Sequence, residues 1–373
     1  MKWLFWCSLA VLAYTFGGYV LWLWFRSLFY KRRVMRAALV PSVSIVMVVR
    51  NEEGVLEDKL RNLLDLDYPQ ECLRVVVVSD GSTDRTEAIL RRYAENPRVH
   101  VLMNFLQQGK ASGLNDAMAW TQGEIVVFTD ARQRIESGAL RLLTENFADP
   151  EVGCVSGELM LGDCESGEVV NGTGLYWRIE KRVRELESST GSVVGATGAL
   201  YAVRRELIPA VPAGTILDDV YIPMCVARSG ARVVFDGRAR AWDAPDLGAQ
   251  REFRRKVRTL SGNYQLLQIA PWLLRGENPL RFQFISHKLL RLLAPFALAA
   301  ALISTVFLPA PLYRAALLCQ IIFYALGFLG MLPGEKGPLT RMADAAYTFV
   351  MLNVAALMAF GNFVTRRKEL WVR

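Results

Sequence analysis

VSIVMVV, residues Val43–Val49, is a short, continuous apolar run that is rich in β-branched side chains. Such a run is typical of a strand that is buried on both faces of a parallel sheet. Similar runs follow at Val75–Val78, Val99–Met103 and Ile125–Phe128, and stretches of helical character separate them. Alternation of strands and helices predicts an α/β domain with right-handed crossovers. The predicted helices span 56–66, 82–95, 112–121 and 137–147.

Polar and acidic residues stand where three of these predicted strands end, at 50–53, 79–84 and 129–132. Ligands of such sheets bind beyond the carboxyl ends of the strands. Carboxylates and a Gly-containing turn at one edge indicate a nucleotide with a bound cation, because a hard cation takes oxygen ligands and neutralises a diphosphate. Taken singly, the motifs are weaker: Asp80-Gly81-Ser82 is first a turn signal, and Asp84 with Glu87 has the spacing of a capping box.

The composition excludes several classes of protein. Apolar residues make up 52% and charged residues 21% of the 373 positions, which argues against a disordered or wholly soluble chain. The net charge of +8 favours either nucleic acid or an anionic membrane face as partner. Six Cys without a CxxC pair, and two His, indicate neither a zinc site nor a disulfide framework, so we expect a reducing, cytoplasmic setting.

A membrane anchor is predicted near the N-terminus. Trp3–Phe25 contains no charged residue over 23 positions, which is long enough for a helix to span a bilayer. Basic residues follow the run instead of preceding it, so we interpret it as an uncleaved anchor with the rest of the chain on the cytoplasmic side. These basic residues are Arg26, Lys31, Arg32, Arg33 and Arg36.

Three further apolar stretches lie in the last part of the chain, at Leu292–Leu308, Ala315–Gly334 and Ala345–Val364. A basic tail with Arg366, Arg367, Lys368 and Arg373 follows them. Three full crossings from the cytoplasm would place this tail outside, against the positive-inside rule. Two explanations stay open: one stretch is re-entrant or interfacial, or the rule fails here.

Seven short motifs follow one another along the chain: VRNEE (49–53), VSDGSTDRT (78–86), GKASGLN (109–115), FTDAR (128–132), TGALYAVRR (197–205), LDDVYIPM (217–224) and RKVRT (255–259). In this order they resemble the family 2 inverting glycosyltransferases, and in particular their membrane-embedded branch with the cellulose, hyaluronan, chitin and poly-N-acetylglucosamine synthases. The resemblance covers about 43–258 and implies a cytoplasmic GT-A domain, a Rossmann-like fold with a mostly parallel sheet, flanked by transmembrane helices.

The expected organisation has five parts. An N-terminal anchor takes up 1–26, the glycosyltransferase domain 40–251 and an amphipathic interfacial segment 252–288. Transmembrane or re-entrant helices follow at 289–364, and a basic tail at 365–373.

On the donor side, the resemblance implies that Asp80 binds the base of a nucleotide sugar and that Lys110 lies near the base or the phosphates. Asp130 matches the first Asp of the metal-binding Asp-x-Asp motif, for Mg²⁺ or Mn²⁺, but Arg132 replaces the second. Either this guanidinium partly replaces the cation charge, or, as we favour, the metal uses one carboxylate with phosphates and waters. Asn51, Glu52 and Ser82 complete the expected donor site.

On the acceptor side, Asp219 matches the general base, which takes the proton of the acceptor hydroxyl opposite the leaving diphosphate. The alternative is that Asp218 and Asp219 only cap a helix from Val220. Arg258 matches the Arg of a Gln-x-x-Arg-Trp motif and would hold the leaving diphosphate. Arg255 replaces the Gln of this motif and Thr259 replaces its Trp. The absence of the Trp weakens the case for a long-chain polymerase. Gly198, Asp218 and Arg255 are assigned to the acceptor side.

Two stretches have apolar residues at helical spacing beside basic ones. The first predicts an amphipathic helix at the membrane interface, whereas an ordinary domain helix explains the second equally well. If both stretches lie on the inner leaflet, anionic membrane lipids explain the excess of Lys and Arg over Asp and Glu, and we expect no nucleic acid partner. The first stripe is Phe253, Val257, Leu260, Tyr264 and Leu267, and the second is Tyr176, Ile179, Val183 and Leu186.

We therefore expect a glycosyltransferase at the inner face of a bacterial plasma membrane. It would move a sugar, with inversion, from a nucleotide sugar, UDP-linked by preference, to a lipid-linked glycan, a lipid or a polysaccharide. One alternative is a processive exopolysaccharide synthase. Another is a catalytically inactive scaffold among the partner proteins of an envelope polysaccharide pathway, an alternative that Arg132 keeps open.

Overall fold

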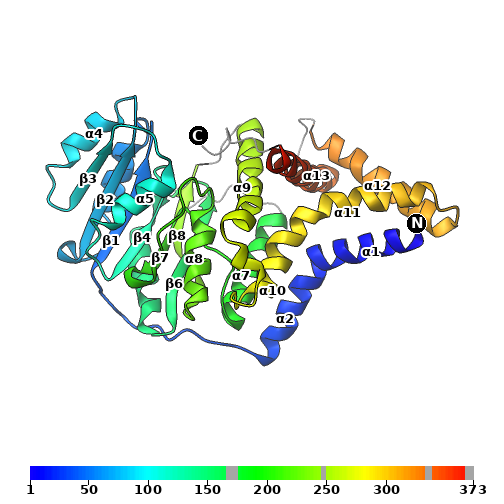
Figure 1. The fold of residues 1–373 in the computed structure, drawn as a ribbon, viewed down its shortest axis with the longest axis horizontal. Helices are drawn as coiled ribbons and strands as arrows, with labels where there is room; N and C mark the ends of the chain where they lie inside the picture. The colour runs from blue at the N-terminus through cyan, green and yellow to red at the C-terminus, as the bar shows by residue number, and fades with distance from the viewer. Residues whose placement is uncertain (165–174, 245–248, 332–337, 366–373) are drawn as a thin grey trace.

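The computed structural model describes residues 1–164, 175–244, 249–331 and 338–365, and one mixed sheet of eight strands organises the part between the apolar helices (Figure 1). The basic tail at 365–373 falls outside these residues, apart from Thr365. The strands are β1 (Val43–Val49), β2 (Leu73–Asp80), β3 (Val99–Asn104), β4 (Ile125–Phe128), β5 (Arg134–Ile135), β6 (Val152–Leu161), β7 (Tyr201–Arg204) and β8 (Arg232–Asp243).

The strand order is β3-β2-β1-β4-β7-β6-β8-β5. The four strands predicted from apolar runs pair in parallel, with Val43 opposite Leu73 and Ile125. The other half departs from a mostly parallel sheet, because β7 runs antiparallel to both β4 and β6, and β5 antiparallel to β8. The sheet is thus mixed, and its parallel half carries the predicted strand ends.

Helices cover both faces of the parallel half. The central strand alternates its side chains between two cores: Ile45 and Met47 pack with Leu60 of α3, whereas Val46 packs with Leu114 of α5. Gly113 lets α5 approach closely, since a Cβ there would lie 2.8 Å from Cγ1 of Val48. The helices are α3 (Leu56–Leu64), α4 (Thr86–Tyr93), α5 (Lys110–Met118), α6 (Ala139–Thr144) and α8 (Asp218–Arg228).

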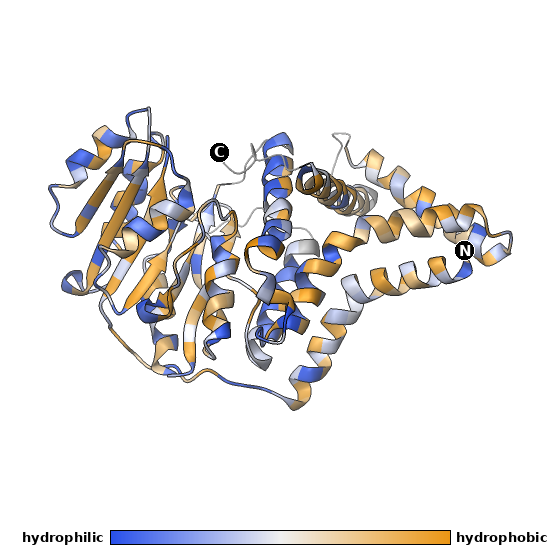
Figure 2. Cartoon of the chain, viewed as in Figure 1, coloured by the Kyte–Doolittle hydropathy of each residue, from blue (hydrophilic) through white to orange (hydrophobic). Residues whose placement is uncertain are grey.

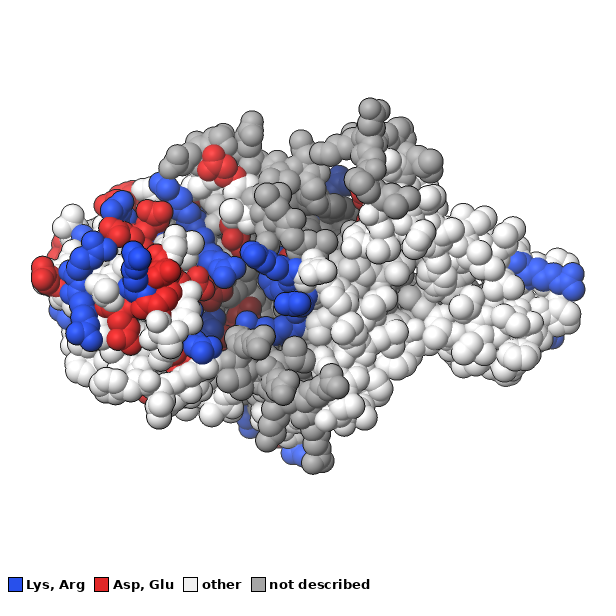
Figure 3. All heavy atoms as spheres, turned by 90° about the horizontal axis from the view of Figure 1, so that it is seen from above, with Lys and Arg blue, Asp and Glu red and all other residues white. Residues whose placement is uncertain are grey.

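Four helices are long and apolar enough to cross a membrane, judged by length and composition in the described residues. The first, Lys2–Phe29, joins α1 (Lys2–Ala13) and α2 (Tyr19–Phe29) through a π-helical turn. The second, Arg281–Val306, joins α10 (Arg281–Phe284) and α11 (Leu290–Val306) in the same way. The others are α12 (Pro311–Leu329) and Met342–Val364 within α13 (Pro338–Val364). Figure 2 shows that these helices are mainly hydrophobic, and Figure 3 shows that most Lys, Arg, Asp and Glu visible on that face lie on the sheet domain.

The last apolar helix is oriented differently from its neighbours. In Figure 1, α13 is seen almost end-on, whereas α1, α11 and α12 extend along the long axis of the molecule. Two glycines let α12 pack closely on it: a Cβ at Gly327 would lie 3.2 Å from Cγ2 of Val350, and one at Gly330 would collide with the backbone oxygen of Ala343. The helix α13 therefore crosses the others instead of continuing their bundle.

The two amphipathic stripes pack against apolar helices. On α9 (Ala249–Ile269), Tyr264 packs with Leu292 of α11 and with Ala359 and Phe363 of α13. On α7 (Leu175–Thr190), Val183 and the other described stripe residues pack with Tyr19 and Leu23 of α2; the side chain of Tyr176 lies outside the described residues. Both helices thus join the sheet domain to the apolar helices, and the apolar stripe of α9 is covered by protein at Tyr264. That α9 lies at a membrane interface stays a prediction.

Candidate active site

The end of β2 and the loop before α5 are tied together by Asp80. Its buried carboxylate accepts hydrogen bonds from the backbone nitrogens of Gln108, at 2.7 Å, and Gly109, at 2.9 Å. Next to it, Gly81 has a φ of 63°, and a Cβ there would lie 2.7 Å from the nitrogen of Gln107. Asp80 therefore fixes the loop that leads into Lys110.

The ends of β1 and β2 are joined by side chains of the predicted donor site. The Oδ1 atom of Asn51 accepts a hydrogen bond from the nitrogen of Thr83 at 2.8 Å, and the nitrogen of Asn51 donates to Oγ of Ser82 at 3.3 Å. Asn51 adopts a φ of 53°, which is uncommon outside glycine. Asp84 accepts from the nitrogens of Thr86, at 2.9 Å, and Glu53, at 3.1 Å, and so holds the turn before α4. The predicted capping box is wrong, because Arg85 is the N-cap of α4 and no side chain caps the helix.

Lys110 lies between two of the predicted carboxylates. Its Nζ atom is 2.9 Å from Oδ1 of Asp130 and 3.2 Å from Oδ2 of Asp218. Burial lowers the pKa of the amine, but Asp130 and Asp218 together outweigh it and hold this pKa above its usual range. The amine is thus a fixed positive charge between residues that come from separate strand and helix ends.

Asp219 lies beside this group, on the first turn of α8. Its Oδ2 atom accepts a hydrogen bond from the nitrogen of Gly198 at 3.1 Å. A Cβ on Gly198 would lie 3.3 Å from Oδ2 of Asp219 and 3.6 Å from Oδ2 of Asp130, so both carboxylates border this glycine. Burial and the charge of Asp218 raise the pKa of Asp219 to about 6, against the opposing charges of Lys110 and Lys288.

Arg132 does not pair with Asp130. Its Nε atom lies 3.6 Å from Oε2 of Glu52, and its side chain is 63% exposed. Burial raises the pKa of Glu52, while Arg132 opposes this rise. The guanidinium thus stays at the rim of the site, where a ligand could reach it.

The residues of the last motif are not brought into the carboxylate group. Arg255 pairs with Glu252 at 2.6 Å and with Asp243 at 3.8 Å. Arg258 is exposed on α9, and within the described ranges it makes no hydrogen bond or ion pair. Its predicted contact with a leaving diphosphate is therefore not preformed.

Lys59, which belongs to none of the motifs, contacts the segment that carries Asp130. Lys59 is 3% exposed, and its Nζ atom donates to Oγ1 of Thr129 at 2.9 Å and to the backbone oxygen of Gln133 at 2.5 Å. Burial lowers its pKa to about 7, although Asp130 acts in the opposite direction. The sequence carried a signal, because Lys59 occupies the apolar stripe that Leu56, Leu60 and Leu63 form at helical spacing.

Asp130 is the residue that fits a divalent cation. No group of three or more His, Cys, Asp or Glu that could hold a metal is found among the described residues. Oδ2 of Asp130 has no hydrogen bond from them, however, and its side chain is 43% exposed. Mg²⁺ is commonly held by one or two carboxylates together with substrate phosphates and waters, so this single carboxylate fits such an ion.

Comparisons with known proteins identify the family to which part of the chain is similar. Residues 44–211 match the model of glycosyl transferase family 2. The beta-monoglucosyldiacylglycerol synthase of Synechocystis is 31% identical over 190 residues, 48% of this chain and 39% of that protein. The poly-beta-1,6-N-acetyl-D-glucosamine synthase of Staphylococcus epidermidis is 22% identical over 239 residues, 62% and 57% of the two chains. The match thus spans about two fifths of the first relative's length.

A solved structure extends the similarity to nearly the whole chain. It is the mannosyltransferase PcManGT from Pyrobaculum calidifontis in complex with GDP-Man and Mn2+. The TM-score is 0.70 at 27% sequence identity, over 95% of this chain and 99% of the other. The similarity therefore includes the apolar helices as well as the sheet domain.

Proposed function

We propose that this chain, whose residues 44–211 belong to glycosyl transferase family 2, is a membrane-bound inverting glycosyltransferase. It transfers a sugar from a nucleoside diphosphate to a hydroxyl of a lipid, a lipid-linked glycan or a polysaccharide. One observation carries the proposal: Asp130 and Asp219 border the same glycine, Gly198, with Lys110 beside them. Asp130, the proposed ligand of the cation, and Asp219, the proposed base, thus lie next to the same glycine.

The base in this proposal is Asp219. Its carboxylate takes the proton of the acceptor hydroxyl while the hydroxyl oxygen bonds to the anomeric carbon, and the bond from that carbon to the diphosphate breaks. Attack opposite the leaving group inverts the configuration. A pKa of about 6 suits a general base near neutral pH, because the group is then ionised yet more basic than an ordinary Asp.

The donor binds in this proposal along the loop that Asp80 fixes, with its phosphates at Lys110 and its metal at Asp130. When bound, Mg²⁺ or Mn²⁺ neutralises the developing diphosphate charge. The similar PcManGT structure contains Mn2+, which supports this use of a cation. We expect full loss of activity in excess chelator; full activity there would assign the charge role to Arg132.

The donor base is predicted to be uracil, but the similar solved structure contains GDP-Man. A panel of UDP- and GDP-sugars, assayed with membrane extract by release of the nucleoside diphosphate, tests the proposal. Wild type should release diphosphate from at least one donor. Asp219→Asn should bind that donor and not transfer from it, and Asp67→Asn, remote on the surface, serves as the control. Retained turnover in Asp219→Asn would remove Asp219 as the base.

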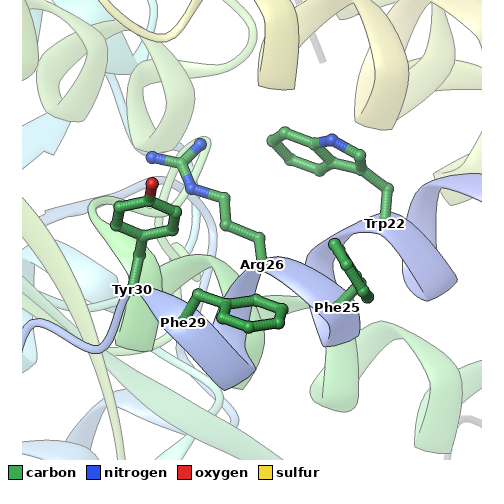
Figure 4. Close-up of a pocket in the computed structure, with 5 residues that line it drawn as sticks. All are labelled: Trp22, Phe25, Arg26, Phe29 and Tyr30. Carbon is green, nitrogen blue, oxygen red and sulfur yellow. The ribbon is translucent and has the colours of Figure 1, made fainter.

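The membrane placement that we propose has three crossings, by Lys2–Phe29, Arg281–Val306 and α12, with α13 lying along the inner face. The end-on view of α13 in Figure 1 supports this, and the basic tail then stays inside, as the charge rule requires. Figure 4 shows a hollow at the end of α2 that aromatic side chains and Arg26 line, with Arg26 5.3 Å from the ring of Trp22. Such a combination is typical of a membrane interface.

Cysteine labelling tests this placement. In a cysteine-free background, Ala310→Cys, between α11 and α12, should react in intact cells with a maleimide that cannot cross the membrane. Thr365→Cys, at the end of α13, should react only after lysis. Labelling of Thr365→Cys in intact cells would show that α13 crosses.

The alternative of a processive synthase has support from the similarity to the poly-beta-1,6-N-acetyl-D-glucosamine synthase. Product length separates the two, since a long polymer from the purified protein would favour the processive reaction. The inactive scaffold predicts no diphosphate release from any donor, together with copurification of another synthase.

A further inference from the structure

Two side-chain amides hold the chain segment that leads into the proposed base. This lead-in segment, residues 211–217, ends where α8 begins with Asp218 and Asp219. At its start, the amide of Asn115 on α5 donates to the backbone oxygen of Val211 at 2.8 Å and accepts from the nitrogen of the same residue, also at 2.8 Å. The first turn of α8 therefore follows a segment whose start is fixed to the sheet domain.

Gln265 of α9 holds the other end of the lead-in segment. Its side chain is buried, and its Nε2 atom donates to the backbone oxygen of Gly214 at 2.8 Å. Its Oε1 atom accepts from the backbone nitrogen of Ile216 at 2.9 Å. Both polar groups of this amide are thus used on backbone atoms that lie shortly before Asp218 in the chain.

Close packing of α9 adds to these hydrogen bonds. A Cβ at Gly262 would lie 2.6 Å from Cγ of Leu217 and 3.1 Å from Cγ2 of Ile216, so the glycine lets the helix approach the lead-in segment. Leu217 is the N-cap residue of α8, and Asp219 follows on the first turn. A shift of α9 against the lead-in segment would therefore displace the start of α8 and, with it, the proposed base.

The proposed base is also held from its other side. Gly198, whose nitrogen donates to Asp219, belongs to a loop that is bonded to Glu187, since the nitrogen of Val194 donates to Oε2 of that carboxylate at 3.3 Å. Glu187 is 1% exposed, and its Oε1 atom lies 3.0 Å from Nδ1 of His287. Replacing a buried carboxylate in such a network leaves its partners unpaired and can unfold the protein. The neutral amide on α9 permits a cleaner test.

We propose that Gln265 is a positioning residue for sugar transfer: by fixing the lead-in segment, it holds the carboxylate of Asp219 where the acceptor hydroxyl can reach it. This inference rests on the proposed function. Gln265 acts through the backbone and contacts neither donor nor acceptor. The residue before it, Tyr264, packs with Leu292 and Ala359 of the apolar helices, so α9 contacts both those helices and the lead-in segment. The placement of the base then depends on how the apolar helices pack against α9.

Two measurements on the purified full-length protein test the proposal. Turnover is measured as diphosphate release from the UDP- and GDP-sugar panel, with membrane extract supplying the acceptor, and the affinities for UDP and GDP are measured by calorimetry. Gln265→Met keeps the length of the side chain but lacks both polar groups. It should lower turnover about 10- to 100-fold, the scale of a small misplacement of a catalytic group, and leave nucleotide affinity unchanged. Gln268→Met, which replaces an exposed Gln of the same helix, is the matched control and should change neither.

Gln265→Glu adds a readout that a packing role would not change. The new carboxyl can accept from Ile216 in either form, but it can donate to the oxygen of Gly214 only when it is protonated. Its turnover relative to wild type should therefore fall as the pH rises from 5 to 9, whereas the ratio for Gln265→Met should stay constant. A constant ratio for Gln265→Glu would overturn the proposal, and this result decides the matter even if Gln265→Met does not fold.

The outcomes separate this inference from the proposed function. A wild type that releases diphosphate from no donor of the panel would contradict the proposed function. If wild type is active and Asp219→Asn is not, equal turnover of wild type and Gln265→Met would overturn the inference alone. A parallel loss of nucleotide affinity in Gln265→Met would assign its effect to the donor site or to folding, and would also overturn it.

Discussion

The ammonium of Lys110 lies 2.9 Å from the carboxylate of Asp130, so the two groups expected to meet a diphosphate and its cation neutralise each other. The same ammonium also lies 3.2 Å from Asp218, so two carboxylates share one cation and the ligand-free site keeps an excess of negative charge. In the proposed function, a cation bound at Asp130 would reduce this excess, and Lys110 would be left to pair with a phosphate.

Replacing Lys110 should show how far donor binding depends on its ammonium. In Lys110→Met, the carboxylates of Asp130 and Asp218 lose their shared cation and repel each other. We expect nucleoside diphosphate affinity to fall by about tenfold or more, the effect of one lost charge-assisted contact. Calorimetry with wild type, Lys110→Met and the control Lys31→Met measures it. Unchanged affinity would remove Lys110 from the donor site.

The pH dependence of transfer should follow Asp219. Because its pKa is raised to about 6, the carboxylate loses its proton, and the rate rises, as the pH passes through about 6. The sign for stability is opposite: the folded protein binds this proton more tightly than the unfolded chain, so stability is lost as the pH rises through that value. Asp219→Asn should therefore melt at a higher temperature than wild type at pH 8, and the difference should shrink as the pH falls through 6 toward 3.8, the ordinary pKa of Asp. An inflection of the rate near pH 4 would contradict the raised pKa.

Gly198 should tolerate no side chain. A Cβ would lie 3.3 Å from Oδ2 of Asp219, which is tighter than most real contacts, and Gly198→Ala should displace the carboxylate while keeping the backbone donor. We expect the turnover number to fall about tenfold, one power of ten for about 1.4 kcal/mol, with smaller changes in donor affinity. Gly191→Ala, where a Cβ would meet nothing within 4 Å, is the control. Equal turnover of the two variants would show that the contact is harmless.

The lowered pKa of Lys59 predicts that the free energy of unfolding increases with pH above about 7. Its pKa is lowered to about 7, so the unfolded chain binds more protons than the folded one between pH 7 and the usual lysine range, and stability increases with pH there. Lys59→Met fits the apolar stripe of α3 and should flatten this increase. Melting temperatures of both proteins at pH 7 and pH 9 measure it. The same gain in both would assign it to other groups.

The sequence predicted the parallel half of the sheet well, because β1 and β4 are short apolar runs buried on both faces. The antiparallel half was not predicted, because β6 and β8 include polar residues such as Glu158 and Arg240 that interrupt the apolar pattern. The predicted end of α3 was also two residues too late, since the helix stops at Leu64. Apolar runs thus identify strands with continuous apolar side chains, including the partly exposed β3, and miss buried strands whose sequence is interrupted by polar residues.

For the site, the motifs located the residues around Lys110 and Asp219, because strand ends of a sheet converge on one edge. They could not supply partners between distant segments. The stripe on α7 fitted an ordinary helix or a membrane helix equally, and only the fold shows that Tyr19 and Leu23 cover it. Lys59 and Gln265 likewise became informative only through the groups that surround them.

His287 lies 3.0 Å from a carboxylate oxygen of Glu180 and of Glu187. These contacts matter for any attempt to obtain a soluble fragment. Expression of the sheet domain from residue 40 onward would delete Tyr19, which donates to Glu187, and uncover the apolar face of α7 that α2 protects. Truncation before 281 would strip both carboxylates of their imidazole. The trimmed enzyme would therefore aggregate, and detergent or nanodisc preparations of the intact chain are the practical route to crystals and assays.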